Sequence, residues 1–202
     1  MSKVEDNKKQ KKDTLLRAAF DLFTEQGITK TSISEIVSKA GVAKGTFYLY
    51  FRDKYDIKNK LISHKANLIF RNAMEALEHE ALDNSEDKII FLCDNIIDQL
   101  TKNKALLSFI SKNLSWGVFK TALIPANQND IDFYEVYTSL LQKSNHIYAE
   151  PEILLFLIVE LVGSACHDSI LYNEPAPIQV TKPYILSSVR NIINSHITGD
   201  KE

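Results

Sequence analysis

The sequence has little of several residues that mark particular classes of protein. It holds only two cysteines, Cys93 and Cys166, among 202 residues, too few for a disulfide framework or a cysteine-based metal site. The longest uninterrupted apolar run, residues 153–159, is too short to cross a bilayer. The lysine-rich start is not followed by the apolar stretch of a signal peptide. We therefore expect a soluble, cytoplasmic protein that does not associate with membranes.

The motifs that carry catalysis are also missing. The sequence has no glycine-rich phosphate loop, no nucleophile elbow and no paired set of histidines and cysteines. Glu75 and His79 lie four residues apart, a spacing that permits metal ligation, but a solvated pair is favoured because no third ligand accompanies them. We expect no enzymatic activity, no metal and no cofactor.

Charge is unevenly distributed along the chain. Residues 1–60 carry 13 Lys and Arg against 8 Asp and Glu, a net charge of +5, whereas the remaining residues carry a net charge of −7. A basic N-terminal part on an acidic body indicates that one end meets a polyanion. Charge alone leaves chance as an alternative.

Glycine and proline are few, 6 and 5 residues, and lie mainly at the ends of apolar patterns. Val, Ile and Thr never alternate with polar residues over the length of a strand, so the pattern predicts an all-α fold. We expect about nine helices, over residues 8–26, 32–41, 44–51, 53–80, 86–102, 104–120, 130–144, 151–172 and 183–197. Residues 1–52 form the expected N-terminal domain, with 1–8 as a flexible basic tip, and residues 53–202 form a larger helical domain.

Two short helices within residues 32–51 are joined by a turn that contains glycine. Ser32 and Glu35 have the spacing of a capping box, which predicts the start of the first of these helices. Gly41 ends it, and the next helix begins near Lys44. This arrangement is typical of a helix-turn-helix unit.

On a helical wheel, residues 44–51 separate into an inner and an outer side. Phe47 and Phe51 fall together and are expected to face the core. The opposite side presents Gly45, Thr46 and Leu49, a set that suits the floor of a DNA major groove because it permits close approach and contact with thymine methyl groups. The flanking side chains, expected to meet phosphates, are Lys44, Tyr48, Tyr50 and Lys54. The alternative is that Tyr48, Leu49 and Tyr50 pack against a neighbouring helix.

The stretch "TLLRAAFDLFTEQGITKTSISEIVSKAGVAKGTFYLYFRDKYDI" resembles the N-terminal DNA-binding domain of TetR/AcrR-family transcriptional regulators. The resemblance rests on the helix that ends at "EQG", the segment "ISEIVSKAGVAKGTFY" and the closing "YF-x-x-K", in this order. It implies a three-helix helix-turn-helix domain. The residues that it assigns to DNA are Thr31 and Ser32 at phosphate, Lys44, Gly45, Thr46, Tyr48 and Tyr50 on the recognition helix, and Lys54 at the start of the next helix.

For the rest of the chain, the resemblance implies a helical body that binds a small molecule and dimerises through its last two helices. Residues 151–172 independently favour this interpretation, because a helix that is apolar almost all round needs partners on two sides. We expect a homodimer interface built from Glu152–Tyr172 and Lys182–Ile197. A central helix buried inside a monomer is the alternative.

The function expected from these features is a ligand-responsive transcriptional regulator. It would be a homodimeric repressor released from a pseudo-palindromic double-stranded DNA operator by a small hydrophobic or aromatic effector. The candidate effector-binding side chains are Phe109, Trp116, Phe119, Tyr137 and His167. The alternative function is a DNA-bound scaffold of the same fold whose body recruits another protein. The effector, the operator sequence and the direction of regulation cannot be read from the sequence.

Overall fold

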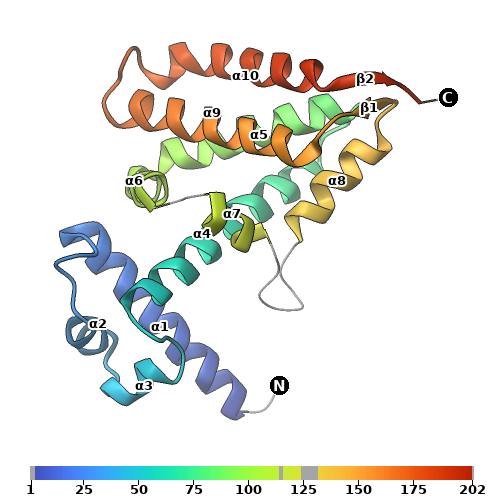
Figure 1. Cartoon of the computed structure of the whole chain (residues 1–202). Coiled ribbons are helices and arrows are strands. Elements are labelled where there is room, and N and C mark those ends of the chain that lie inside the picture. The colour runs from blue at the N-terminus through green and yellow to red at the C-terminus, as the bar shows by residue number, and fades with distance from the viewer. Residues whose placement is uncertain (1–2, 114–115, 124–131, 202) are drawn as a thin grey trace. The chain divides into compact units, whose positions relative to one another are not determined.

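The computed structural model describes residues 3–113, 116–123 and 132–201 (Figure 1). Within these ranges the chain forms ten helices and one short pair of strands, so the predicted all-α fold class is confirmed. The chain divides into two compact units, Met1–His64 and Lys65–Glu202. The division falls inside helix α4 (Lys54–Leu77), which contributes residues to both units.

The N-terminal unit consists of α1 (Lys3–Gln26), α2 (Ile33–Ala40), α3 (Lys44–Tyr48) and the first part of α4. Its core is built from one apolar face of each helix: Leu15, Ala19, Phe23, Ile36, Val37, Phe47, Phe51, Ile57 and Leu61. Helix α1 begins at Lys3, earlier than expected, because no glycine or proline interrupts residues 3–8. Residues 3–8, expected to form a flexible basic tip, therefore belong to α1.

The predicted ends of α2 are confirmed. The Ser32 hydroxyl accepts a hydrogen bond from the Glu35 backbone N–H at 3.2 Å, and the Glu35 carboxylate accepts one from the Ser32 N–H at 2.7 Å. Gly41 ends the helix in the left-handed region, with φ at 66°. The capping box and this glycine together set where the helix-turn-helix turn lies.

Helix α3 is shorter than the expected 44–51 and ends at Tyr48. The chain continues as a turn in which the backbone N–H groups of Tyr50 and Phe51 both donate to the Phe47 carbonyl, at 3.0 and 2.9 Å. Because this turn continues the helical sense, Phe47 and Phe51 still face the same side, as predicted.

The C-terminal unit contains the rest of α4 and six further helices: α5 (Ser85–Lys102), α6 (Lys104–Asn113), α7 (Trp116–Leu123), α8 (Phe133–Lys143), α9 (Pro151–Leu171) and α10 (Ile178–Ser195). The helix expected over 104–120, with an irregularity near Trp116 and Gly117, is two helices, α6 and α7, and Gly117 lies in the first turn of α7. The start of α8 expected at residue 130 lies outside the described residues. The helix is capped by Asp132, whose carboxylate accepts the Glu135 N–H at 2.9 Å.

Helices α9 and α10 run side by side in opposite directions, and α10 also packs on α5 (Figure 1). The prediction that α10 begins at Pro183 was wrong: it begins at Ile178, between the helices expected over 151–172 and 183–197. Pro183 lies early in the helix, where it removes one backbone hydrogen bond. Burial of Ile178, together with Ile185 and Val189, offsets that loss.

By length and composition, α9 is apolar enough to cross a membrane. The core helix of a soluble protein passes the same test, and seven of its side chains are buried here against neighbouring helices: Leu154, Leu155, Ile158, Val162, Cys166, Ser169 and Ile170. Packing within the unit therefore accounts for much of its apolar character.

A short antiparallel pair of strands, β1 (His146–Tyr148) and β2 (Ile197–Asp200), was not predicted. Strand β1 comes after α8 in the chain, and β2 comes directly after α10. Just beyond β2, the Lys201 ammonium donates to the carbonyls of Gln142 and Ser144 at the end of α8, at 2.5 and 2.9 Å. Three- and four-residue strands are too short for an alternating pattern to show in the sequence. The strand pair ties the C-terminal end of α10 to α8.

Candidate nucleic-acid interface and effector cavity

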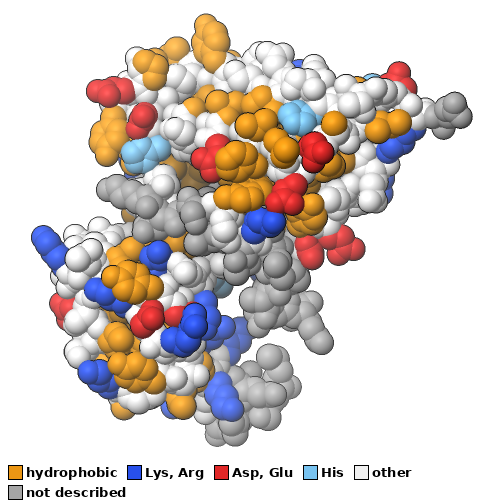
Figure 2. Space-filling view, in the orientation of Figure 1, with side chains coloured by type: hydrophobic (Ala, Val, Ile, Leu, Met, Phe, Trp, Pro, Cys, Tyr) orange, Lys and Arg blue, Asp and Glu red, His pale blue; other side chains and the backbone are white. Residues whose placement is uncertain are grey.

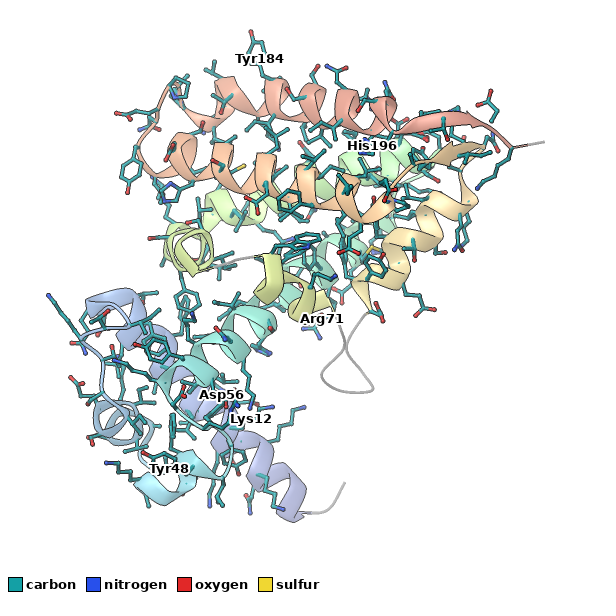
Figure 3. The ribbon with its side chains drawn as sticks, viewed as in Figure 1. Lys12, Tyr48, Asp56, Arg71, Tyr184 and His196 are labelled. Carbon is teal, nitrogen blue, oxygen red and sulfur yellow. The ribbon has the colours of Figure 1, made fainter. Side chains whose placement is uncertain are left out.

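Helix α3 presents an apolar surface that the N-terminal unit does not cover. Phe47 is 0% exposed and Phe51 is 2% exposed, with their ring centroids 5.4 Å apart. On the outer side, Leu49 is 79% exposed and Tyr48 is 54% exposed (Figure 3). A leucine and a tyrosine left uncovered beside a fully buried phenylalanine form a surface suited to a partner molecule.

Gly45 has no structural reason within the unit to be glycine. It is exposed, and a Cβ added there would meet no atom within 4 Å. Glycine in a helix costs roughly up to 1 kcal/mol relative to alanine. A bare backbone on the outer side of α3 therefore suits close approach by an external molecule, and the contact of Gly45, Thr46 and Leu49 with a DNA groove stays a prediction.

Thr31 and Ser32 take structural roles at the start of α2. Thr31 is 1% exposed, and its hydroxyl donates to the Gly27 carbonyl at 2.8 Å, so it closes the loop that links α1 to α2. Ser32 is exposed but its hydroxyl serves the capping box. Contact of Thr31 with phosphate through its side chain would require this internal hydrogen bond to break.

The Lys54 ammonium is surrounded by backbone carbonyls of the α1–α2 loop. It donates to Ile28 and Thr29 at 3.0 Å each and to Thr31 at 3.2 Å. These three bonds use all three ammonium donors. Lys54 therefore holds the α1–α2 loop in this structure, a role that sequence reasoning did not find because the partners are carbonyls 23 to 26 residues away.

A second group of contacts fixes the turn between α3 and α4. The Asp56 carboxylate accepts the Arg52 backbone N–H at 2.9 Å and the Lys60 ammonium at 3.2 Å. Lys60 also donates to the Tyr50 carbonyl at 3.0 Å. Burial alone would raise the pKa of Asp56, but the Arg52 N–H and the Lys60 ammonium lower that pKa below its ordinary value of 3.8. The carboxylate therefore stays ionised and helps to fix the turn that links α3 to α4.

Exposed cations surround α3. Lys44, Arg52 and Lys60 are exposed in the N-terminal unit, and Figure 2 shows several Lys and Arg side chains on its visible face. Tyr55, 55% exposed, adds an aromatic side chain at the start of α4 that sequence reasoning missed. The unit thus combines an uncovered apolar patch with basic flanks, the pattern of a DNA-reading surface.

The C-terminal unit encloses a cavity of about 570 Å³. Its wall is mainly aliphatic and comes from α4, α5, α6, α7, α8 and α9, including Ile69, Leu92, Ile96, Leu107, Leu140, Leu155 and Val162. This volume lies in the range of sites for drug-sized molecules, roughly 300–1,000 Å³. The size and the mainly apolar lining of this cavity suit an apolar ligand.

Three of the five predicted effector residues line this cavity: Phe119, Tyr137 and His167. Trp116 does not line it and stacks behind Phe119, with ring centroids 5.4 Å apart. Phe109 is buried but also lies outside the lining. The aliphatic side chains that make most of the wall were missed, because in sequence they are indistinguishable from ordinary core residues.

Few polar groups face the cavity. The Tyr137 hydroxyl donates to the Pro151 carbonyl at 2.9 Å, and burial raises its pKa well above the ordinary value. Burial also raises the pKa of the Cys93 thiol to about 12, which keeps it protonated and unreactive. The His167 imidazole lies 2.7 Å from the Asp168 carboxylate.

Within the described residues, no group of three or more His, Cys, Asp and Glu could hold a metal ion, and Glu75 and His79 are both exposed.

Residues 15–60 match the family model described as "Bacterial regulatory proteins, tetR family". The resemblance stated from the sequence is confirmed for this segment, which is a TetR-type helix-turn-helix segment. The family is one of transcriptional regulators and not of enzymes.

Among curated proteins, the chain is 39% identical over 89 residues to an uncharacterized HTH-type transcriptional regulator, YvdT, of Bacillus subtilis (strain 168). This match covers 44% of the chain and 43% of the relative, so the chain spans less than half the length of that relative. Two solved structures share the fold over most of the chain.

The first of these structures is the fatty acid degradation regulator FadR from Bacillus halodurans, with a TM-score of 0.66, 17% identity, and coverage of 88% of this chain and 97% of that one. The second is FadR from Bacillus subtilis in complex with stearoyl-CoA, with a TM-score of 0.57 and 17% identity. It covers 89% of this chain and 98% of the FadR chain. At these identities the likeness concerns the fold.

Proposed function

We propose that this protein is a ligand-responsive transcriptional regulator that binds double-stranded DNA through α3. The observation that carries the proposal is the outer surface of α3, where Leu49 and Tyr48 are uncovered and Gly45 is bare. Thr46 and Leu49 would contact base edges, while Lys44, Tyr48 and Tyr50 would contact phosphates. Lys54 would act mainly by holding the α1–α2 loop, and Ser32 by fixing the start of α2.

The regulator is a homodimer in this proposal. Large apolar side chains are exposed on α9, where Ile153 is 49% exposed, and on α10, where Tyr184 is 73% exposed and points into solvent (Figure 3). Phe156 and Leu157 on α9 and Val180 on α10 are exposed as well, and Figure 2 shows hydrophobic side chains on the visible face of this unit. Pairing the segments Glu152–Tyr172 and Lys182–Ile197 with a second copy would bury this surface and give two DNA-binding units. Two such units suit a pseudo-palindromic operator with half-sites roughly 34–36 Å apart.

The effector of this regulator is a small apolar molecule in the cavity, and its binding releases the operator. Helix α4 supports such coupling because it contributes Ile57 and Leu61 to the core of the N-terminal unit and Ile69 and Phe70 to the cavity wall. An effector that prefers one arrangement of α4 lowers DNA affinity by its differential affinity for the two states. The FadR structure with stearoyl-CoA offers a precedent of the same fold with an apolar chain bound. Repression, and a cytoplasmic location, follow from this mode of action.

The alternative of a DNA-bound scaffold that recruits a protein has less support. It would require an exposed charged groove on the C-terminal unit, whereas the cavity there is lined mainly by aliphatic side chains. A small apolar ligand fits that wall better than a protein segment does.

Fluorescence anisotropy on DNA from upstream of the gene for this protein tests the proposal, with a scrambled duplex as control and salt raised in steps. We expect tight binding to the native duplex, weakened by salt, and at least about 10³-fold weaker binding to the scrambled one. Equal, weak binding to both duplexes would contradict a sequence-specific regulator.

A further inference from the structure

We propose that the cavity selects an apolar molecule with a cationic head, such as a long-chain or aromatic ammonium, and discriminates against carboxylate and phosphate heads. The inference rests on the proposed function in one respect, that the cavity is the effector site. It goes further by fixing the charge of the ligand, which the resemblance in fold to FadR leaves open.

The polar groups of the cavity lie mostly along one side of α9. Glu160, Ser164, His167 and Asp168 follow the i, i+4, i+7, i+8 spacing of a single helical face. Glu160 and Asp168 are exposed while most of the aliphatic wall residues are buried, so this face forms the polar edge of the cavity. A ligand that fills the cavity with an apolar body would carry its polar head at this edge.

The formal charge of this edge is negative. Among the described residues that line the cavity, Glu160 and Asp168 are the ionised side chains, and no lysine or arginine lines it. Asp168 lies in the last turn of α9, where the backbone carbonyls add a negative partial charge. The His167 imidazole is already paired with Asp168 at 2.7 Å.

Two lysines of the C-terminal unit are paired with carboxylates outside the cavity lining. Lys120 pairs with Glu152 at 2.7 Å, and Lys182 pairs with Asp94 and Asp98 at 2.8 and 2.6 Å. Neither lysine lines the cavity. An anionic head would therefore lose water without gaining a counter-ion and would meet two like charges, whereas an ammonium head would gain two opposite charges.

The fluorescence of Trp116 provides a way to measure ligand binding in the cavity. Trp116 is the only tryptophan in the sequence, and it stacks on Phe119, which lines the cavity. Its fluorescence should change when the cavity fills. We would titrate the full-length protein, below the micelle concentration, with dodecyltrimethylammonium, with 1-dodecanol and with dodecanoate, which share one chain and differ in head charge.

We expect the cation to bind at least roughly tenfold more tightly than dodecanoate, with the alcohol between them. Glu160→Gln combined with Asp168→Asn should weaken the cation roughly fivefold, because each carboxylate is exposed and worth only a few-fold. The same double variant should leave 1-dodecanol unchanged. Glu75→Gln is the matched control, since it removes an exposed carboxylate of the same unit that does not line the cavity.

The inference would be overturned if dodecanoate bound as tightly as the cation. It would also be overturned if none of the three molecules changed the fluorescence of Trp116. An equal loss of cation affinity in Glu75→Gln and in the double variant would also overturn it, because the effect would then be one of bulk charge. Selective cation binding that leaves DNA affinity unchanged would uphold the inference and contradict the proposed function.

Discussion

The two units of this chain differ in where their unusual residues lie. In the N-terminal unit, the residues that depart from ordinary folding rules are on the surface: Leu49 and Tyr48 are uncovered, and Gly45 is a glycine that nothing in the unit requires. In the C-terminal unit, the cavity wall away from its polar edge consists mainly of ordinary buried or half-buried apolar side chains. Exposed apolar side chains and a glycine that the fold does not need can be recognised in a sequence as a candidate binding surface. A cavity lined by aliphatic side chains cannot, because the same residue types form the hydrophobic core.

The largest expected effect is a loss of stability that is confined to the N-terminal unit. Phe47→Ala removes a side chain that is 0% exposed at the centre of the N-terminal core. We expect a loss of about 3–5 kcal/mol in the stability of that unit, and loss of DNA binding, measured by circular dichroism in denaturant and by anisotropy. Trp116 fluorescence, which reports the other unit, should show ligand binding as in the unaltered protein. Loss of ligand binding as well would show that the units do not act separately.

Lys54→Met tests whether this lysine acts on the loop or on DNA. The change leaves the Ile28, Thr29 and Thr31 carbonyls without their donor. We expect a stability loss of about 1–3 kcal/mol in the N-terminal unit, measured by chemical denaturation. Lys30→Met, at an exposed lysine of the same loop, is the control and should change stability little. Unchanged stability in Lys54→Met together with weaker DNA binding would instead favour a phosphate contact.

Gly45→Ala is expected to separate function from stability. Because a Cβ at this position meets nothing, the folded unit should be unchanged or more stable by up to about 1 kcal/mol. DNA affinity should nevertheless fall, since the added methyl group would obstruct close approach of the backbone to the groove. Thermal melting and anisotropy together check this, and unaltered DNA affinity would remove α3 from the interface.

The smallest effect concerns acid stability. The pKa of Asp56 is lowered in the folded state, so its ion pair and hydrogen bonds contribute stability above the unfolded-state pKa and lose it as pH falls through the folded-state value. We expect protonation of Asp56 to lower the stability of the N-terminal unit by about 1 kcal/mol or less as the pH falls below 3.8, the ordinary pKa of this carboxyl group. Asp56→Asn should flatten this part of the pH profile in a denaturation series. A profile with the same slope in both proteins would show that other carboxyl groups are responsible.

Sequence reasoning worked where a local rule decides the structure. Ser32, Glu35 and Gly41 act within one helix, so the limits of α2 followed from their spacing. Phe47 and Phe51 followed from the helical period, even though α3 ends at Tyr48.

It failed where tertiary contacts decide. The early start of α10 depends on burial of Ile178, and the roles of Lys54 and Thr31 depend on carbonyls supplied by a loop. The β1–β2 pair joins residues about fifty positions apart, which no local pattern reveals. Phe119, Tyr137 and His167 were found only because aromatic side chains are rarer than the aliphatic ones beside them.

The central claim is that occupancy of the cavity in one unit changes DNA binding by the other. The most direct test is anisotropy of the protein–DNA complex, titrated with a ligand whose occupancy is followed by Trp116 fluorescence in the same sample. The account predicts that DNA affinity falls at least roughly fivefold as the cavity saturates, in proportion to occupancy. A saturated cavity with unchanged DNA affinity would contradict it.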